Sequence, residues 1–417
     1  MAIIKPFKGL RPPKNKVEEV ACLPYDVMNS EEATQMANGK EASLLRITRA
    51  EIEFEKGTDS HSEKVYLHAK SNFEAFQEKK YLVQDSEDKY YIYAQTMNGK
   101  TQYGIVGAAS CQDYIDGNIK KHELTRPDKE EDRKVLSRIL EANIEPVFFT
   151  YRAVPEIDAI VSDIVINNKA EYDFTSEDGF GHHFWVIDDT TINKKIELLF
   201  KKKVPCTYVA DGHHRTAAAA NMSSEFRKKN PNHTGNEPYN YFMAVHFPDT
   251  QLQIIDYNRV VKDLNGFKPA EFLEKISEHF GITQISESVI KPEKLHDFSM
   301  YLNGKWYGLT ASKPTYNDDN PIDSLDVSVL SKFILEPILN IKDLRTDTRI
   351  DFVGGIRGLD ELSKRVDIGE MAVAFALFPV SMNQLMNIAD TGNIMPPKVT
   401  WFEPKLRSGL VINKLNG

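Results

Sequence analysis

The stretch "VPCTYVADGHHRTAAAANM" (residues 204–222) joins a short apolar run to an alanine-rich segment. The apolar run ends at Asp211-Gly212, and two histidines and an arginine follow directly before four consecutive alanines. A short apolar run bounded by a turn signal is typical of a buried strand, and alanine is the strongest helix former. We therefore predict a strand, a corner at residues 211–212 and then a helix.

The residue types at this corner indicate an anion site. Asp211 stands where it could cap the helix, which would explain Asp211 and Gly212 but not His213, His214 and Arg215. A helix N-terminus presents free N–H groups and favours negative charge, and an arginine can hold two oxygens of one phosphate. Phosphate binding is therefore the preferred interpretation over capping alone.

A metal site is the alternative at this corner. His213 and His214 are neighbours on a helix start and point in different directions, so at most one is an easy ligand. His182 and His183 lie on a predicted strand and face opposite sides of it. No HExxH motif and no cysteine partner supports zinc. We expect one of His182 and His183 to be a packed core residue.

A second group of polar residues occurs in "KKHELTRPDKEEDR" (residues 120–133). Pro127 predicts a helix start, and the helix should run to about residue 142. His122 and Glu123 stand just before it, with Arg126 three residues on. Glu123 is placed to act as a general base, although charged residues at a helix start are also common as a solvated face.

Two further segments contain candidate site residues. In "CLPYDVMNSEEA" (residues 22–33), Asp26 is either a site residue or part of a turn. The Pro-rich segment "GNIMPPKVTWFEPKLRSG" (residues 392–409) reads either as a loop ordered by an anion or as a plain surface loop. Its polar residues are Lys398, Thr400, Lys405, Arg407 and Ser408.

The chain as a whole predicts an α+β protein with mixed sheets. Its 417 residues exceed a single core, and we expect a boundary near residue 265, which gives domains 1–265 and 266–417. Asn98-Gly99 and Asn303-Gly304 are hairpin signals. "NYFMAVHF" and "LQIIDYNRVV" (residues 240–247 and 252–261) should form a further pair of strands.

The bulk composition limits the partners and the location. A net charge of −9 argues against broad binding to a phosphate backbone, so a nucleic-acid partner is not expected. The three cysteines are far apart, which disfavours disulfides and a cysteine-based zinc site. No apolar run is long enough to span a membrane, and the start has no signal-peptide pattern. We expect a cytoplasmic protein.

Four motifs taken together resemble a known family. "PYDV", "HELTRPDKEEDR", "YVADGHHRTAAAA" and "MPPKVTWFEPKLRSGLV" look like the DUF1015 family, essentially from end to end. That family in turn resembles the ADP-dependent free L-serine kinases of the ParB/sulfiredoxin-like superfamily. In those kinases a P-H-E motif, a strand leading into D-G-H-H-R and a late S-P-K-T-T segment occur in this order. The matching pieces here are residues 122–123, 211–215 and 396–400. This chain has far more residues before its H-E pair.

The resemblance implies a fold and an activity. The fold would be a ParB/sulfiredoxin-like mixed-sheet core with N-terminal additions, and a smaller α+β C-terminal domain would close the site. The activity would be phosphoryl transfer from ADP or ATP to a small hydroxyl compound, with free L-serine, giving O-phosphoserine, as the leading acceptor. Such chemistry needs positioning and charge neutralisation more than covalent steps.

The resemblance also implies roles for individual residues. Glu123 would take the acceptor's proton, and Asp211 would orient the histidines or bind Mg²⁺. The catalytic residues would be Glu123, Asp211 and His213. Gly212, His213, His214, Arg215 and Thr216 would contact the nucleotide phosphates. The substrate-binding residues would be Asp26, His122, Arg126, Lys398 and Thr400.

Two other functions remain open from the sequence. The same corner could serve a nucleotide hydrolase or phosphatase, with water in place of the hydroxyl. It could also belong to a non-catalytic ParB-like module that binds nucleotide or DNA, although the acidic composition does not favour DNA. The sequence leaves the donor nucleotide, the acceptor and the oligomeric state undetermined.

Overall fold

The computed structural model describes residues 1–416, and the chain divides into two compact units. The first unit comprises Met1–Leu252 and the C-terminal segment that begins at Pro404, and the second comprises Gln253–Glu403. The expected boundary near residue 265 therefore lies inside the second unit. The C-terminal segment returns to the first unit, where the Ser408 N–H donates to the Cys22 carbonyl.

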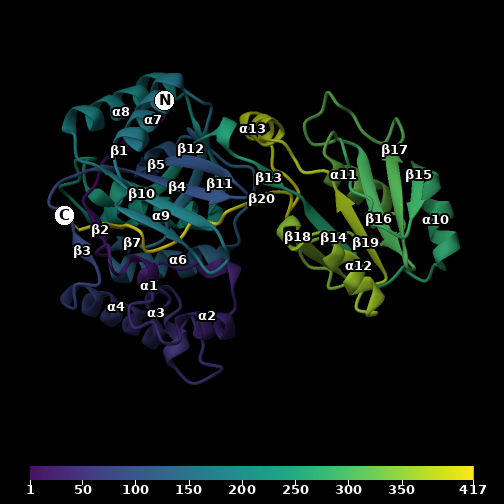
Figure 1. The fold of residues 1–417 in the computed structure, drawn as a ribbon, viewed down its shortest axis with the longest axis horizontal. Helices are drawn as coiled ribbons and strands as arrows, with labels where there is room; N and C mark the ends of the chain where they lie inside the picture. Colours follow the sequence, from purple (N-terminus) through teal and green to yellow (C-terminus); the bar gives the residue numbers. More distant parts are fainter. Residues whose placement is uncertain (417) are drawn as a thin grey trace. The chain divides into compact units, whose positions relative to one another are not determined.

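The first unit is built on a nine-stranded mixed sheet (Figure 1). Two pairs, β11 with β6 and β12 with β8, are parallel, and the remaining pairs are antiparallel. Along the sheet the order is β6 (Ile119–Lys120), β11 (Thr207–Asp211), β8 (Val147–Tyr151), β12 (Tyr241–Pro248), β5 (Lys100–Ser110), β4 (Tyr90–Met97), β10 (Gly181–Ile187) and β9 (Tyr172–Thr175). β1 (Ile4–Lys5) pairs with β5.

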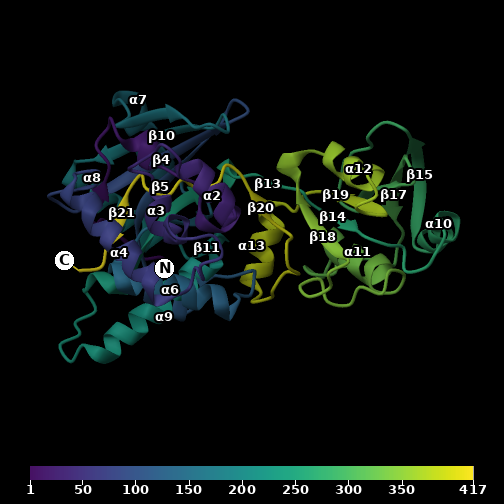
Figure 2. The same cartoon turned by 90° about the horizontal axis from the view of Figure 1, so that it is seen from below.

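Helices cover both faces of this sheet (Figure 1; Figure 2). On one side lie α7 (Pro155–Asn167) and α8 (Thr190–Lys203), and on the other α6 (Pro127–Leu140) and α9 (His213–Lys229). α5 (Cys111–Ile115) follows β5 directly. The four alanines 217–220 are all buried, so the small side chains of α9 let this helix pack closely on its neighbours.

The N-terminal segment forms a small helical layer, and its apolar cluster also includes Leu136 and Leu140 of α6. Its elements are α1 (Val17–Val20), α2 (Ser30–Ala37), α3 (Leu45–Thr48), α4 (Glu63–Glu78) and the short helices η1 (Tyr25–Val27) and η2 (Ala50–Glu53). A four-stranded sheet adjoins this layer, in the order β3 (Val83–Gln84), β2 (Gly9–Arg11), β21 (Ile412–Lys414) and β7 (Ala142–Asn143). The C-terminal strand β21 is thus hydrogen-bonded to an N-terminal one.

The second unit is an antiparallel sheet with helices and its own apolar core. The strand order is β15 (Phe280–Ser286), β17 (Lys305–Ala311), β16 (Asp297–Leu302), β19 (Val373–Leu377), β14 (Tyr257–Val261) and β18 (Ile350–Gly354). Its helices are α10 (Pro269–Ser277), α11 (Asp326–Leu330), α12 (Asp360–Asp367) and α13 (Met382–Asp390). β13 (Ile254–Ile255) pairs with β20 (Trp401–Phe402).

The structure confirms the mixed α+β class and several local expectations. Both Asn-Gly pairs turn hairpins, between β4 and β5 and between β16 and β17, with positive φ at all four residues. The helix predicted from Pro127 is α6. The expected pairing of residues 240–247 with 252–261 is wrong, because β12 lies between β8 and β5 whereas β14 lies between β19 and β18. Within residues 1–416, no helix combines the length and apolarity needed to cross a membrane.

Candidate active site

Two parallel strands bring the predicted motifs together. β6 pairs with β11 so that Lys120 lies opposite Tyr208. Parallel strands end at the same edge of a sheet, so the residues after β6 meet those after β11. His122 and Glu123 therefore lie beside the start of α9, and potential ligand atoms of His122, Glu123 and His213 all lie within 4.8 Å of one another. Two motifs about 90 residues apart in the sequence thus lie side by side in the structure.

The start of α9 has no side-chain cap. The N-cap residue is Gly212, with φ of 94°, and neither Asp211 nor another described side chain hydrogen-bonds to the first turn as a cap. That turn also contains no acidic residue. The capping interpretation of Asp211 is therefore wrong, and the free N–H groups of the helix keep their attraction for an anion.

Gly212 also allows a close contact. A Cβ at this position would lie 3.1 Å from Nε and 3.2 Å from Cζ of Arg215. The guanidinium thus packs directly over the corner. Arg215 is buried, and its Nη1 donates to the carbonyl of Pro146, while its Nε has no hydrogen-bond partner among the described residues.

The Asp211 carboxylate lies between two cations. Its Oδ2 is 3.5 Å from the ammonium of Lys405 and 3.6 Å from Nη2 of Arg215. Burial alone would raise the pKa of Asp211, but Lys405 and Arg215 outweigh it and lower this pKa to about 2. A magnesium ion here would meet both positive groups, so this carboxylate does not fit the Mg²⁺ ligand expected from the sequence.

His122 and His213 are a buried pair of imidazoles. Their rings meet edge to face, with centroids 4.5 Å apart. Burial lowers the pKa of His122 to about 4, although Asp211 and a hydrogen bond to the Val209 backbone oppose this shift. Burial and then His122 also lower the pKa of His213. Both rings are neutral at pH 7, so the expected phosphate contact of His213 would involve hydrogen bonding and not charge.

His214 faces a different set of groups. Its Nε2 accepts a hydrogen bond of 3.0 Å from the backbone N–H of Arg126. Burial lowers the pKa of His214, while the charge of Asp26 opposes this shift and Arg126 adds to it. An accepting Nε2 on a neutral ring leaves the proton on Nδ1. His214 thus ties the start of α6 to the start of α9 and brings Arg126 and Asp26 near the corner.

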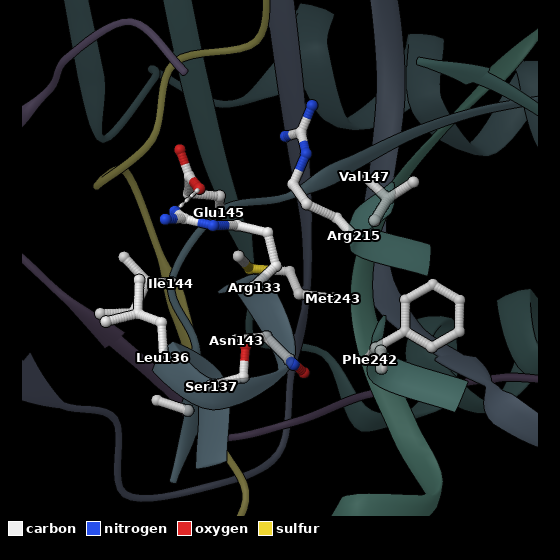
Figure 3. Close-up of a pocket in the computed structure, with 12 residues that line it drawn as sticks. Arg133, Leu136, Ser137, Asn143, Ile144, Glu145, Val147, Arg215, Phe242 and Met243 are labelled. Carbon is white, nitrogen blue, oxygen red and sulfur yellow. Dashed lines mark hydrogen bonds and ion pairs between the residues drawn. The ribbon is translucent and has the colours of Figure 1, made fainter. Parts of the chain in front are cut away.

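The N-terminal "PYD" segment lies against the same corner. The backbone N–H of Tyr25 donates to Glu145, and the guanidinium of Arg133 stacks 3.8 Å from the centre of the Tyr25 ring. Arg133 in turn pairs with Glu145 at 3.4 Å (Figure 3). Beneath this layer, Arg133, Glu145 and Arg215 help to line a cavity of about 30 Å³, which has room for a water molecule but not for a nucleotide.

Three expected site residues lie elsewhere or have other contacts. The hydroxyl of Thr216 is fully buried and donates to the carbonyl of Gly212, which fits a structural role and not the expected phosphate contact. Lys398 and Thr400 belong to the second unit. There the Lys398 carbonyl accepts a hydrogen bond from Arg259, and the roles of Lys398 and Thr400 stay predictions.

The family model for "Protein of unknown function (DUF1015)" matches residues 4–328. The chain belongs to the DUF1015 family. Three of the four motifs that suggested this family lie within the matched range. The fourth, "MPPKVTWFEPKLRSGLV", lies after it. A search of curated proteins gives no match.

Solved structures similar to this DUF1015 protein include a free serine kinase in complex with AMP. It is 13% identical, with a TM-score of 0.36, and the match covers 74% of this chain and 91% of that one. SbnI with a C-terminal truncation from Staphylococcus aureus is 12% identical, with a TM-score of 0.37, covering 74% and 87%. A conserved hypothetical protein from Pyrococcus furiosus is 13% identical, with a TM-score of 0.33, covering 74% and 95%.

Several residues of this DUF1015 site escaped the sequence analysis. Lys405 was seen only as part of a polar loop, yet it is the partner of Asp211. Arg133 and Glu145 were not predicted, because nothing in the sequence shows that α6 packs against the Tyr25 segment. His182 proves to be the packed histidine of its pair: it is fully buried and hydrogen-bonded to Tyr93 at 2.8 Å, while His183 pairs with Asp173.

Proposed function

We propose that this protein is a small-molecule phosphotransferase that moves a phosphoryl group from a nucleotide to a hydroxyl acceptor. Free L-serine is the acceptor that the motif order favours, and O-phosphoserine would be the product. ADP or ATP would be the donor. A ParB/sulfiredoxin-like core is part of the same proposal.

One observation supports this function above the others. A carboxylate, Glu123, lies within 4.8 Å of His213 at the uncapped N-terminus of a long helix. Phosphoryl transfer needs a site for the donor phosphates and a base for the acceptor, and the residues at this edge of the sheet would supply both. The buried Arg215 and the ammonium of Lys405 add positive charge beside the helix start.

Each group of residues would have its own role in binding or in proton transfer. The free amides of the first turn of α9 would hold phosphate oxygens, with Arg215 beside them. Glu123 would accept the proton of the acceptor hydroxyl, whose oxygen forms a bond to phosphorus as the bond to the nucleotide oxygen breaks. Asp211, paired with Lys405 and Arg215, would hold these two cations in place. Asp26 and Arg126 would contact the acceptor.

The proposal is tested by product formation with matched glutamate variants. Purified protein is incubated with ADP or ATP as the Mg²⁺ salt and a panel of hydroxylated amino acids, and phosphorylated products are measured by mass spectrometry. Wild-type protein should form O-phosphoserine. Glu123→Gln should lower the rate by about 10²- to 10⁴-fold, which is the usual contribution of a general base.

Glu131→Gln is the control, because Glu131 lies on α6 with 57% of its side chain exposed. This variant should keep the wild-type rate. Equal loss in both variants, or no phosphorylated acceptor from any member of the panel, would contradict the proposal. Acceptor-independent loss of nucleotide would instead identify a hydrolase.

A further inference from the structure

We propose that His122, Glu123 and His213 form a binding site for a divalent transition metal of the zinc class. Their potential ligand atoms lie within 4.8 Å of one another. Ligands of a tetrahedral ion at about 2.1 Å lie roughly 3.4 Å apart, so these atoms would have to approach one another by at most about 1.4 Å. His122 is 2% and His213 6% exposed, so the site is shielded from water on the side of the imidazoles.

His213 has buried nitrogens that require a partner. Neither Nδ1 nor Nε2 of this ring has a hydrogen-bond partner within residues 1–416, and both atoms are buried. A buried polar atom left without a partner costs about 1 to 3 kcal/mol. A bound metal ion would satisfy one of these nitrogens, and the edge-to-face contact with His122 already holds the ring in place.

His122 is oriented as metal-binding histidines usually are. One ring nitrogen hydrogen-bonds to the backbone of Val209. In metal sites the non-ligating N–H of a histidine commonly donates to a backbone carbonyl, which fixes the tautomer and leaves the lone pair of the other nitrogen for the metal. β11 supplies that carbonyl and continues into the corner that carries His213, so a single strand positions two of the ligands.

The donor set determines the class of metal. Magnesium prefers six oxygen ligands, whereas two imidazoles and one carboxylate are the ligands of zinc and of first-row ions such as cobalt and manganese. Three protein ligands leave a coordination position open. On the basis of the proposed function, this position would take the acceptor's hydroxyl oxygen, and the proton that it loses would pass to the carboxylate oxygen of Glu123 that does not bind the metal.

The metal alone tests this site, without nucleotide or acceptor. Chelator-treated protein is titrated with Co²⁺, whose visible absorption reports nitrogen and oxygen ligands, and binding is then challenged with Zn²⁺ and with excess Mg²⁺. We expect one Co²⁺ per chain, displaced by Zn²⁺ but not by Mg²⁺. His213→Asn and Glu123→Gln should each weaken binding by at least about 100-fold, because even second-shell changes cost 10- to 100-fold.

His183→Ala is the matched control, since His183 is a partly exposed histidine paired with Asp173 outside the cluster. It should bind Co²⁺ as the wild type does. Circular dichroism of each variant checks the fold. If His213→Asn does not fold, Glu123→Gln still tests the site, because glutamine has the same shape as glutamate. Absence of Co²⁺ binding in the wild type, or equal binding by the folded variants, would overturn the site. Metal binding without phosphoryl transfer would keep the site and reject only the proposed function.

Discussion

Gly212 meets two requirements at a single residue. Its φ of 94° lies in the left-handed region, and its missing side chain lets the Arg215 guanidinium approach the corner. Any other residue would strain the backbone and displace the arginine. The conformation of this one residue therefore determines where the cation of the site lies.

Gly212→Ala should destabilise the protein by about 2 to 3 kcal/mol, because about 1 to 2 kcal/mol of left-handed strain adds to the contact with Arg215. Urea unfolding measures this change. Gly99→Ala is the control, since Gly99 has φ of 75° but nothing within 4 Å of the added Cβ. Gly99→Ala should lower the free energy of unfolding only by the left-handed backbone strain. Equal losses in the two variants would show that packing against Arg215 contributes nothing.

The buried His246 should make the free energy of unfolding depend on pH. It is buried between Phe149 and Phe200, its nitrogens have no hydrogen-bond partner among the described residues, and burial lowers its pKa to about 3. Below pH 6.5 the unfolded chain binds a proton there that the folded chain does not, so stability falls as the pH falls.

His246→Leu should remove this contribution. Between pH 6.5 and pH 4, the slope of unfolding free energy against pH should become shallower by up to about 1.4 kcal/mol per pH unit. Urea unfolding at a series of pH values measures the slope. An unchanged slope would mean that His246 is protonated in the folded protein.

At the scale of elements, the C-terminal segment is held in the first unit by Arg407. This buried side chain pairs with Asp178, and its Nη2 donates to Ser176 at 3.0 Å. Its backbone N–H donates to Tyr93 at 3.2 Å. The same segment carries Lys405, so its attachment also places the partner of Asp211.

Arg407→Met should lower the free energy of unfolding by about 2 to 3 kcal/mol, since it leaves the partly buried Asp178 without its cation. Lys40→Met is the matched control on the neighbouring residue Glu177, whose side chain is 79% exposed in its pair with Lys40. This exposed pair should contribute less than about 1 kcal/mol. Thermal or urea unfolding compares the two, and a similar small loss in both would refute the role given to Arg407.

Local signals made several elements predictable. Asn98-Gly99 determines its hairpin because both residues accept positive φ, and Pro127 begins α6 because proline fits a first helical turn. The choice of strand partner was not predictable. β12 and β14 are both apolar runs separated by a short connection, a pattern typical of a hairpin, yet long-range pairing places them in different sheets.

The same limit applies to the candidate site. Residues 211–215 and 122–123 were found because adjacent residues carry the pattern. Lys405 lies almost 200 residues from Asp211, and Glu145 is brought to the corner by long-range packing, where it accepts from the Tyr25 N–H. Contacts between residues so distant in the sequence leave no pattern within a short stretch of it. The capping role considered for Asp211 failed because the N-cap of α9 is Gly212, and the Asp211 carboxylate instead contacts Lys405 and Arg215.

At the scale of the whole molecule, the chain consists of one interrupted and one continuous unit. The second unit, Gln253–Glu403, has its own sheet and apolar core. A fragment of residues 253–403 should therefore fold alone, with a cooperative transition and a stability of about 5 to 15 kcal/mol. A chain ending at residue 403 should lose stability, because β21 completes the sheet with β2 and β7. Circular dichroism and urea unfolding test both, and an unfolded 253–403 fragment would contradict the division.

The central claim is that the corner at residues 211–215 and Glu123 together transfer a phosphoryl group to a hydroxyl. ³¹P NMR of one reaction containing the protein, L-serine and the Mg²⁺ salt of ADP or ATP tests it directly, since it separates O-phosphoserine from inorganic phosphate. We predict a growing phosphoserine signal that matches the loss of nucleotide and disappears in Glu123→Gln. Inorganic phosphate alone, formed at the same rate without serine, or no loss of nucleotide at all, would contradict the claim.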